Sequence, residues 1–345
     1  MNYRLKVPSK KKSSKPMPKT SVASSTGKRA YSKREFRFID LFAGVGGMRL
    51  ALESVGGTCV FSSEWDIHAQ KTYAANFGEV PHGDITKIKT KDIPHFDVLS
   101  AGFPCQPFSS FGKRAGFKHK TQGTLFFDVL RIIESKKPDA FILENVKGLI
   151  SHDSRRTMET ILGALDSAGY EVIHTVLNAA NFGVPQHRER VYMVGFRRQK
   201  FGTDIDFQWP AKKRKNVGIG KHIEENVKDF SISKHLQRVY IFKKKDGRPE
   251  IVTSRTETPA KTLVASYHKI QRLSGTFVKD GPTGLRLLTP SECKAIMGFP
   301  KSFQLPVSRT QMYRQMGNSV AVPVVSAIAK EIVTTLNSHL NSKRK

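Results

Sequence analysis

The sequence predicts an α/β fold in which a mostly parallel sheet carries helices on both faces. Short apolar runs bounded by turn residues alternate with segments of helical period between Phe36 and Phe196, and such alternation is typical of βαβ units. The first apolar run leads into a glycine-rich turn and then a helix-like segment. Hydrophobic residues make up 38% of the 345-residue chain, which is enough for a substantial core. These observations favour a folded α/β protein over a disordered or repetitive one.

Each predicted strand is short and apolar, with the β-branched and aromatic residues that suit a buried strand. The first ends at the glycine turn, and the second ends in the polar run Ser63-Glu64-Trp65-Asp66. Strands are expected at Phe36–Phe42, Thr58–Ser62, Phe96–Ala101, Ala140–Leu143, Val172–Leu177 and Val191–Phe196.

The segments between these strands place apolar side chains three and four residues apart, as on one face of a helix. The first of them stops at Gly56-Gly57, because glycine commonly ends a helix. Helices are expected at Met48–Val55, Ile67–Phe77, Leu125–Ser135 and Arg155–Ala168.

The character of the chain changes after Phe196. Helical periodicity weakens there, and lysine clusters such as Lys243-Lys244-Lys245 appear. We therefore expect a second, smaller and irregular domain over residues 197–306.

Apolar order returns at Leu285–Gly298, and an Ala- and Val-rich helix is predicted over Val320–Leu336. A helix of that composition would be buried against the sheet. The first domain is therefore predicted to be discontinuous and to comprise residues 35–196 plus 307–340.

Net charge is the strongest compositional feature, with 58 Lys and Arg against 29 Asp and Glu. Residues 1–34 contain eleven Lys and Arg and no acidic residue, and residues 197–285 contain twenty Lys and Arg against nine Asp and Glu. This surplus favours a polyanionic partner, usually a nucleic acid, although a ribosome-associated or merely very soluble protein would look similar.

Residues 1–34 are rich in Lys, Ser and Pro, and we expect a flexible tail there. The tail is either a solvated leader or a non-specific clamp on phosphates. A transit peptide is a weaker third interpretation, because the segment is Lys-rich rather than Arg-rich.

The three cysteines, Cys59, Cys105 and Cys293, have spacings that fit neither a disulfide framework nor a zinc site. This usage suits a reducing compartment. We also find no apolar run near the ~20 residues that cross a bilayer and no secretory signal. The expectation is a soluble cytoplasmic protein without a metal or membrane contact.

The turn that ends in Gly46-Gly47 follows the first strand and would let a ligand approach the main chain closely. It is not G-x-G-x-x-G, and the carboxylate of Asp40 just before it would repel a pyrophosphate. The carboxylate of Glu64, after the next strand, can accept hydrogen bonds from both hydroxyls of a ribose. S-adenosylmethionine, which is cationic, fits better than a dinucleotide, with Asp84-Ile85 as a further contact. An ordinary tight turn is the alternative.

Cys105 lies in the run Pro104-Cys105-Gln106-Pro107, at the carboxyl end of the predicted strand Phe96–Ala101. Ligands bind at that edge of α/β sheets, and the flanking prolines keep the thiol out of a helix. The loop continues through Ser109, Lys113 and Arg114 and is polar, basic and glycine-punctuated, as suits a lid over an anionic substrate. A buried inert cysteine is the alternative.

Two further groups are expected near this edge. Glu144 follows the strand Ala140–Leu143, and a carboxyl group there could protonate or hydrogen-bond a heterocycle. Arg188 and Arg190 precede the strand Val191–Phe196, and either could anchor a base carbonyl or a phosphate. Each is weak evidence alone, since strand-end charges are common at protein surfaces.

Taken in order, these motifs resemble those of the DNA (cytosine-5)-methyltransferases of prokaryotic restriction–modification systems. The resemblance covers roughly residues 36–340 and includes Arg286-x-Leu288-x-Pro290-x-Glu292. Its motifs are Asp40–Gly47, Glu64-Trp65, Pro104-Cys105-Gln106, Glu144-Asn145-Val146, Gln186-x-Arg188-x-Arg190 and Gly317-Asn318-Ser319-Val320.

The resemblance implies a Rossmann-like mixed sheet, S-adenosylmethionine as cofactor, and methyl transfer to a cytosine flipped out of duplex DNA. Cys105 would add to carbon 6, protonated Glu144 would contact ring nitrogen 3, and Arg190 would bind the carbonyl at carbon 2. Arg188 would belong to the same catalytic group. The implied cofactor contacts are Asp40, Phe42, Val45, Gly46, Glu64, Trp65, Asp84, Ile85, Pro104, Leu125, Asn318 and Val320.

The resemblance also makes residues 197–306 a target-recognition domain. DNA contacts are expected from Ser109, Lys113, Arg114 and Thr262. We expect a monomer, with a companion restriction endonuclease acting on the same DNA sequence.

Three other functions remain open at this stage. A tRNA cytosine-5 methyltransferase could share the fold, and so could a non-catalytic DNA-binding regulator. A nucleotide-dependent oxidoreductase is the remaining α/β alternative.

Overall fold

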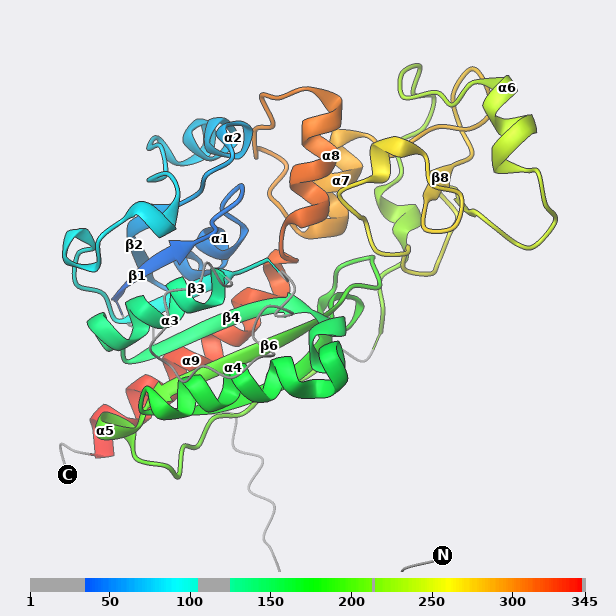
Figure 1. Ribbon diagram of the computed structural model, residues 1–345. Helices are drawn as coiled ribbons and strands as arrows, with labels where there is room; N and C mark the ends of the chain where they lie inside the picture. The colour runs from blue at the N-terminus through cyan, green and yellow to red at the C-terminus, as the bar shows by residue number, and fades with distance from the viewer. Residues whose placement is uncertain (1–34, 105–124, 213–214, 343–345) are drawn as a thin grey trace, which may run out of the picture. The chain divides into compact units, whose positions relative to one another are not determined.

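The computed structural model describes residues 35–104, 125–212 and 215–342, and the structural account concerns these ranges (Figure 1). A six-stranded sheet of order β2-β1-β3-β4-β6-β5 forms its centre. The first four strands in this order are parallel, whereas β6 runs antiparallel to both β4 and β5. The strands are β1 (Phe36–Leu41), β2 (Gly57–Ser63), β3 (Val98–Gly102), β4 (Ala140–Val146), β5 (Tyr170–Asn178) and β6 (Glu189–Arg197).

Helices cover both faces of the sheet, as predicted (Figure 1). Phe38 and Ile142 point to one face, into a core shared with α1 and α9, while their neighbours Ile39 and Phe141 point to the other, against α3 and α4. This alternation follows from the two-residue period of a strand. The helices are α1 (Gly47–Glu53), α2 (Ile67–Phe77), α3 (Leu125–Lys136), α4 (Arg156–Ser167), α8 (Arg309–Asn318) and α9 (Val322–Ser342).

The C-terminal helices differ in two ways from the sequence expectation. The single helix predicted over Val320–Leu336 is α9, and the chain also forms α8 before it. The stretch Arg309–His339 is long and apolar enough to cross a membrane by length and composition, which corrects the expectation that no such run exists. In the most apolar part of this stretch, 67% is buried inside the protein, so these side chains belong to the core.

The segment between β6 and α8 has little regular structure. Its one sheet within the described residues is the parallel pair β7 (Glu250–Val252) and β8 (Thr276–Val278). The helices here are α5 (Arg198–Phe201), α6 (Lys234–Leu236), the π-helical turn η8 (Gln237–Ile241) and α7 (Pro290–Met297). The 3-10 turns η7 (Ile219–His222) and η9 (Tyr267–Lys269) also lie in this segment. The other short 3-10 turns connect strands of the six-stranded sheet and are η1 (Ile85–Lys87), η2 (Thr90–Asp92), η4 (Lys147–Ile150), η5 (His152–Arg155) and η6 (Ala179–Phe182).

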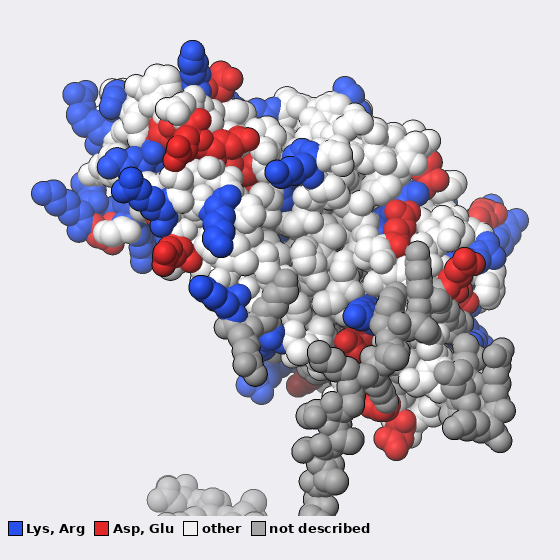
Figure 2. All heavy atoms as spheres, turned by 180° about the vertical axis from the view of Figure 1, so that it is seen from behind, with Lys and Arg blue, Asp and Glu red and all other residues white. Residues whose placement is uncertain are grey.

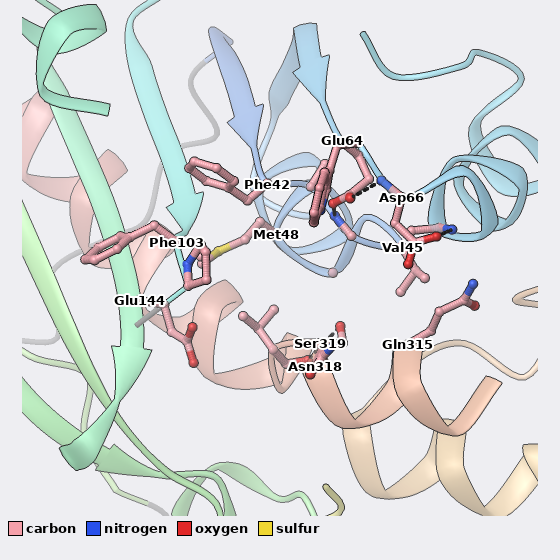
Figure 3. Close-up of a pocket in the computed structure, with 18 of the residues that line it drawn as sticks. Phe42, Val45, Met48, Glu64, Asp66, Phe103, Glu144, Gln315, Asn318 and Ser319 are labelled. Carbon is pink, nitrogen blue, oxygen red and sulfur yellow. Dashed lines mark hydrogen bonds between the residues drawn. The ribbon is translucent and has the colours of Figure 1, made fainter. Parts of the chain in front are cut away.

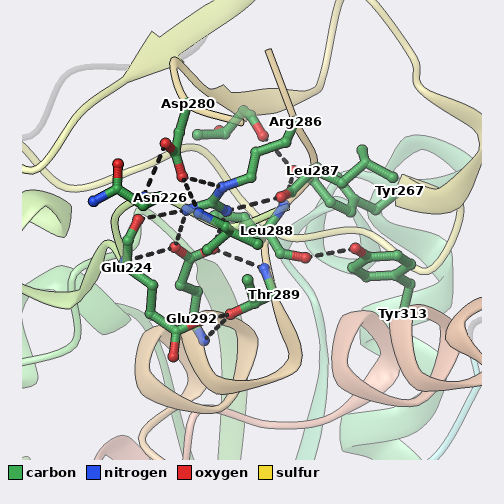
Figure 4. Close-up of polar contacts among 12 residues, drawn as sticks. Glu224, Asn226, Tyr267, Asp280, Arg286, Leu287, Leu288, Thr289, Glu292 and Tyr313 are labelled. Carbon is green, nitrogen blue, oxygen red and sulfur yellow. Dashed lines mark hydrogen bonds and ion pairs between the residues drawn. The ribbon is translucent and has the colours of Figure 1, made fainter. Parts of the chain in front are cut away.

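A buried ionic network joins α7 to other parts of this irregular segment (Figure 4). Arg286 is fully buried and pairs with Asp280 at 2.9 Å and with Glu292 at 2.8 Å. Its guanidinium also donates to the carbonyl oxygen of Glu224 at 2.7 Å. Glu292 completes a capping box with Thr289 at the start of α7. One arginine therefore ties three separate stretches together, because a buried guanidinium needs an acceptor for each of its donors.

The division into two domains stays a prediction.

A glycine in β6 makes the packing of the sheet testable. A Cβ on Gly195 would lie 2.1 Å from the ring of Phe141, its partner on β4. We expect Gly195→Ala to lower the free energy of unfolding by about 1–3 kcal/mol through overpacking. The matched control is Gly163→Ala in α4, where a Cβ meets nothing within 4 Å and should stabilise the helix by up to about 1 kcal/mol. Urea unfolding measures both, and equal stability of the two variants would contradict this packing.

Candidate functional site

A cavity of about 580 Å³ lies at the carboxyl edge of the parallel strands (Figure 3). Residues that end or follow β1, β2, β3 and β4 form its walls, and the end of α8 closes one side. Parallel strands bring their carboxyl ends to one edge, so side chains far apart in the sequence meet there.

The turn after β1 forms the first wall. Gly44 and Gly46 have φ values of +55° and +89°, a region that glycine enters without steric cost. Glu64 fixes this turn, since its carboxylate accepts hydrogen bonds from the backbone N–H groups of Gly44 and Asp66, both at 2.8 Å. Burial raises the pKa of Glu64 above its ordinary value, while these two N–H donors oppose the rise. Phe42 has a φ of +55°, a conformation that non-glycine residues rarely adopt.

Ten of the twelve predicted cofactor contacts line this one cavity. Trp65 stands at its wall with 77% of its surface exposed, although tryptophan is usually largely buried. Asp84 uses one carboxylate oxygen to cap η1, at 3.0 Å from the N–H of Thr86. The ten are Phe42, Val45, Glu64, Trp65, Asp84, Ile85, Pro104, Leu125, Asn318 and Val320.

Asp40 and Gly46 do not line the cavity. Asp40 is fully buried, and its carboxylate accepts a hydrogen bond from the hydroxyl of Ser100 at 2.9 Å. Its second oxygen has no partner among the described residues. Burial raises the pKa of Asp40 to about 7. The alternation of β1 explains this position: Asp40 shares the face of Phe38, under α1, so its side chain cannot follow the chain into the turn.

Sequence reasoning missed several residues of the cavity wall. Gln315 on α8 is the clearest case: its side-chain amide donates to the carbonyl oxygen of His68 at 2.9 Å and accepts from the hydroxyl of Thr72 at 2.9 Å. These two bonds join α8 to α2. No motif in the sequence indicates it, because only the tertiary fold brings the two helices together. Other cavity residues that were not predicted as contacts are Gly44, Met48, Ser63, Asp66, Thr86, Phe103 and Ser319. Of these, Gly44, Ser63, Asp66 and Ser319 lie within motifs or runs that the sequence analysis identified.

Glu144 and Arg190 form an ion pair at the opposite wall of the cavity, with Oε1 and Nε 3.1 Å apart. Glu144 is 8% exposed. Burial raises its pKa, and the neighbouring Arg190 and Arg188 guanidinium groups oppose that rise. The strand β4 was predicted to end at Leu143 but continues to Val146, because β6 pairs with it as far as Arg190.

Arg188 lies beside this pair, and its guanidinium is already engaged with the main chain. It donates to the carbonyl oxygens of Leu263 at 3.1 Å, Gly317 at 3.0 Å and Ser319 at 2.5 Å. The residue is 3% exposed, and burial lowers its pKa to about 10.

Cys105, Ser109, Lys113 and Arg114 lie outside the described residues. The flanking residues Pro104 and Leu125 both line the cavity. The side-chain amide of Asn145 donates to the carbonyl oxygen of Phe103 at 2.9 Å, which fixes the end of β3 to that of β4.

Thr262 lies in a second cavity, of about 600 Å³, next to the first. Arg190 lines both cavities, and Lys147 and Glu189 form an ion pair of 3.0 Å in the second. The hydroxyl of Thr262 donates to the carbonyl oxygen of His187. Within the described ranges, no group of three His, Cys, Asp or Glu side chains is arranged to hold a metal ion.

Comparison with known proteins identifies the family. The family described as C-5 cytosine-specific DNA methylase matches residues 36–334. The chain belongs to this family. It is a DNA (cytosine-5)-methyltransferase, and the prediction from its motifs is confirmed.

Its relatives include type II methyltransferases. It is 57% identical to the type II methyltransferase M.MspI of Moraxella sp. over 311 residues, which cover 90% of this chain and 73% of that protein. It is 58% identical to M.BsuFI of Bacillus subtilis over 293 residues, which cover 85% of this chain and 71% of that protein. The family's fold is confirmed by solved structures: a Spodoptera frugiperda DNMT2 mutant matches with a TM-score of 0.68 at 24% identity, over 86% of this chain and 99% of the other.

Proposed function

We propose that this methyltransferase modifies a cytosine flipped out of duplex DNA, with S-adenosylmethionine in the glycine-turn half of the cavity and the base against Glu144 and Arg190. One observation carries the proposal: a desolvated carboxyl–guanidinium pair and a glycine turn held by Glu64 open into the same cavity. The type II relatives support a role as the modification enzyme of a restriction–modification system. Its place of action would be the cytoplasm.

The walls suit the proposed cofactor chemically. The exposed indole of Trp65 offers a stacking surface for adenine, and the carboxylates of Glu64 and Asp84 are acceptors for ribose hydroxyls and an amino group. Gly44 opens onto the cavity, and a Cβ there would meet nothing within 4 Å. S-adenosylmethionine, when bound, supplies an electrophilic methyl group. Asp40 would support the turn from beneath rather than contact the ligand.

The Glu144–Arg190 pair would hold the cytosine ring by its polar edge. Protonated Glu144 donates to ring nitrogen 3, and Arg190 donates to the carbonyl oxygen at carbon 2. Because burial raises the pKa of Glu144, the carboxyl group keeps its proton at a higher pH than an exposed glutamate would. Withdrawing electron density from the ring makes carbon 6 more electrophilic.

Cys105 would be the nucleophile. Its thiolate would form a bond to carbon 6, and the electron pair of the C5–C6 double bond would become available at carbon 5. Carbon 5 would take the methyl group as its bond to the sulfonium sulfur of S-adenosylmethionine breaks, and the neutral thioether S-adenosylhomocysteine would leave. A base then removes the proton from carbon 5, the C5–C6 double bond re-forms and the thiolate leaves. An ordinary thiol, with a pKa of about 8.5, is mostly protonated at neutral pH, so the site must activate the thiol of Cys105.

The segment from residue 197 to 306 would hold and read the DNA. Figure 2 shows that Lys and Arg gather on the side of the molecule that carries α6, where Lys234, Arg238 and Lys243–Lys245 are exposed. Such side chains neutralise phosphates and make affinity depend on salt. Thr262, with Lys147 beside it, would face a phosphate next to the flipped base. We propose that the enzyme acts as a monomer, with an endonuclease of the same specificity as its companion.

Transfer of tritium from labelled S-adenosylmethionine tests the substrate. Duplex DNA should become labelled, and tRNA should not. Label only in tRNA would reject the DNA proposal, and failure to bind S-adenosylmethionine in calorimetry would reject the cofactor.

The pH dependence of methyl transfer tests the role of Glu144. Since the protonated form is the active one, the rate should fall as pH rises through the raised pKa of Glu144. Glu144→Gln is neutral at every pH and should lose this alkaline limb while turning over more slowly. Glu144→Ala should lower kcat by about 100-fold or more. Initial rates between about pH 6 and pH 9 measure this, and an unchanged alkaline limb in Glu144→Gln would contradict the assignment.

The indole of Trp65 tests the cofactor site. Trp65→Ala should weaken S-adenosylmethionine binding in calorimetry by about tenfold, because a stacking surface worth roughly 1 kcal/mol or more is lost. Trp209→Ala is the control, since Trp209 packs on Phe207 and does not line the cavity. If Trp65→Ala bound S-adenosylmethionine as tightly as Trp209→Ala and the wild-type protein, the cofactor would bind elsewhere.

A further inference from the structure

Two backbone segments that serve different ligands in the proposed function lie in direct contact. Gly317 precedes the cofactor-side residues Asn318 and Val320, whereas Val264 and Ala265 follow Thr262 on the DNA side. A Cβ on Gly317 would lie 2.2 Å from the backbone nitrogen of Ala265 and 2.3 Å from the carbonyl carbon of Val264. Only a residue without a side chain permits this approach.

The guanidinium of Arg188 donates hydrogen bonds to both of these segments. One terminal nitrogen donates to the carbonyl oxygen of Leu263 at 3.1 Å, and the other donates to those of Gly317 at 3.0 Å and Ser319 at 2.5 Å. The three acceptors are 75, 129 and 131 residues away in the sequence. A buried guanidinium that loses its acceptors is costly, so the bonds hold both segments at fixed positions relative to Arg188.

Gln186 provides a second tie to the DNA-side segment. Its side-chain oxygen accepts from the backbone N–H of Leu263 at 2.7 Å, and its nitrogen donates to the carbonyl oxygen of Ile296 at 2.8 Å. Leu263 is therefore held through both its N–H and its carbonyl group. Arg190, two residues beyond Arg188, forms the ion pair with Glu144. The short stretch from Gln186 to Arg190 thus anchors the DNA-side segment, the cofactor-side segment and the base pocket at once.

We propose that Arg188 is a positioning residue that couples the cofactor-side segment Gly317–Val320 to the DNA-side segment Thr262–Ala265, and that it does not bind the target base. This inference rests on the proposed function. It revises the expectation that Arg188 is catalytic, because both terminal nitrogens of the guanidinium donate to main-chain carbonyls and only the buried Nε has no partner among the described residues. When the bonds are lost, both segments shift, so S-adenosylmethionine and DNA should both bind more weakly.

The test measures the two affinities separately in Arg188→Met. Calorimetry gives the affinity for S-adenosylmethionine. Fluorescence anisotropy gives the affinity for an unmodified duplex that carries the sequence the enzyme methylates. We expect each to weaken about tenfold, with kcat at saturation reduced by less than about threefold and its pH profile unchanged. If Arg188 bound the base instead, kcat would fall by about 100-fold and the affinity for S-adenosylmethionine would stay unchanged; that result would overturn the proposal.

Two further variants keep the test decisive if Arg188→Met folds poorly. Arg188→Lys keeps the charge and can reach one carbonyl, so its losses should be intermediate. Gly317→Ala separates the two segments directly and should weaken both affinities as Arg188→Met does. Arg197→Met is the control, because it loses an ion pair with Asp139 at the other end of β6. This control should have a lower Tm while both affinities remain unchanged. If all Arg188 and Gly317 variants also lost only Tm, Arg188 would be a purely structural residue and the proposal would be wrong.

The proposed function can fail independently of this inference. In that case the wild-type protein itself would bind neither S-adenosylmethionine nor duplex DNA. Failure of the inference alone would leave wild-type binding intact and spare one or both affinities in the variants.

Discussion

The ion pair between Glu144 and Arg190 depends on the direction of a single strand. In an all-parallel sheet, the start of β6 would lie at the edge opposite the carboxyl end of β4. Because β6 runs antiparallel, its first residues reach the same edge as Glu144, and Arg190 lies opposite Val146 in the register. The two groups are buried together there. When Glu144 loses its proton, the guanidinium of Arg190 compensates the negative charge that the carboxylate acquires.

Other buried polar groups of the fold stabilise segments that have little regular structure. Arg286 binds acceptors from three stretches between residues 224 and 292, and Arg188 binds acceptors from two more. In a region with few strands and helices, backbone carbonyls lack ladder partners, and an arginine can satisfy several at once. Both arginines therefore serve as local substitutes for secondary structure, and Arg188 does so at the wall of the cavity.

The sequence predicted the features that depend on local pattern. The alternation of apolar runs and helical segments predicted β1, α2 and α4 almost to the residue, and the spacing of the glycine turn and Glu64 predicted one wall of the cavity. Features set by long-range contacts could not be predicted. The direction of β6 depends on pairing with β4, and the commitment of Arg188 depends on carbonyls more than 70 residues away. Asp40 was expected in the cavity, but the strand period turns it beneath α1.

Bisulfite sequencing of unmodified duplex DNA, after incubation with the purified enzyme and S-adenosylmethionine, tests the central claim most directly. Methylation at carbon 5 protects cytosine from conversion. The account predicts protected cytosines at every copy of one short sequence and nowhere else. Complete conversion of all cytosines, or protection scattered without a common sequence, would contradict it.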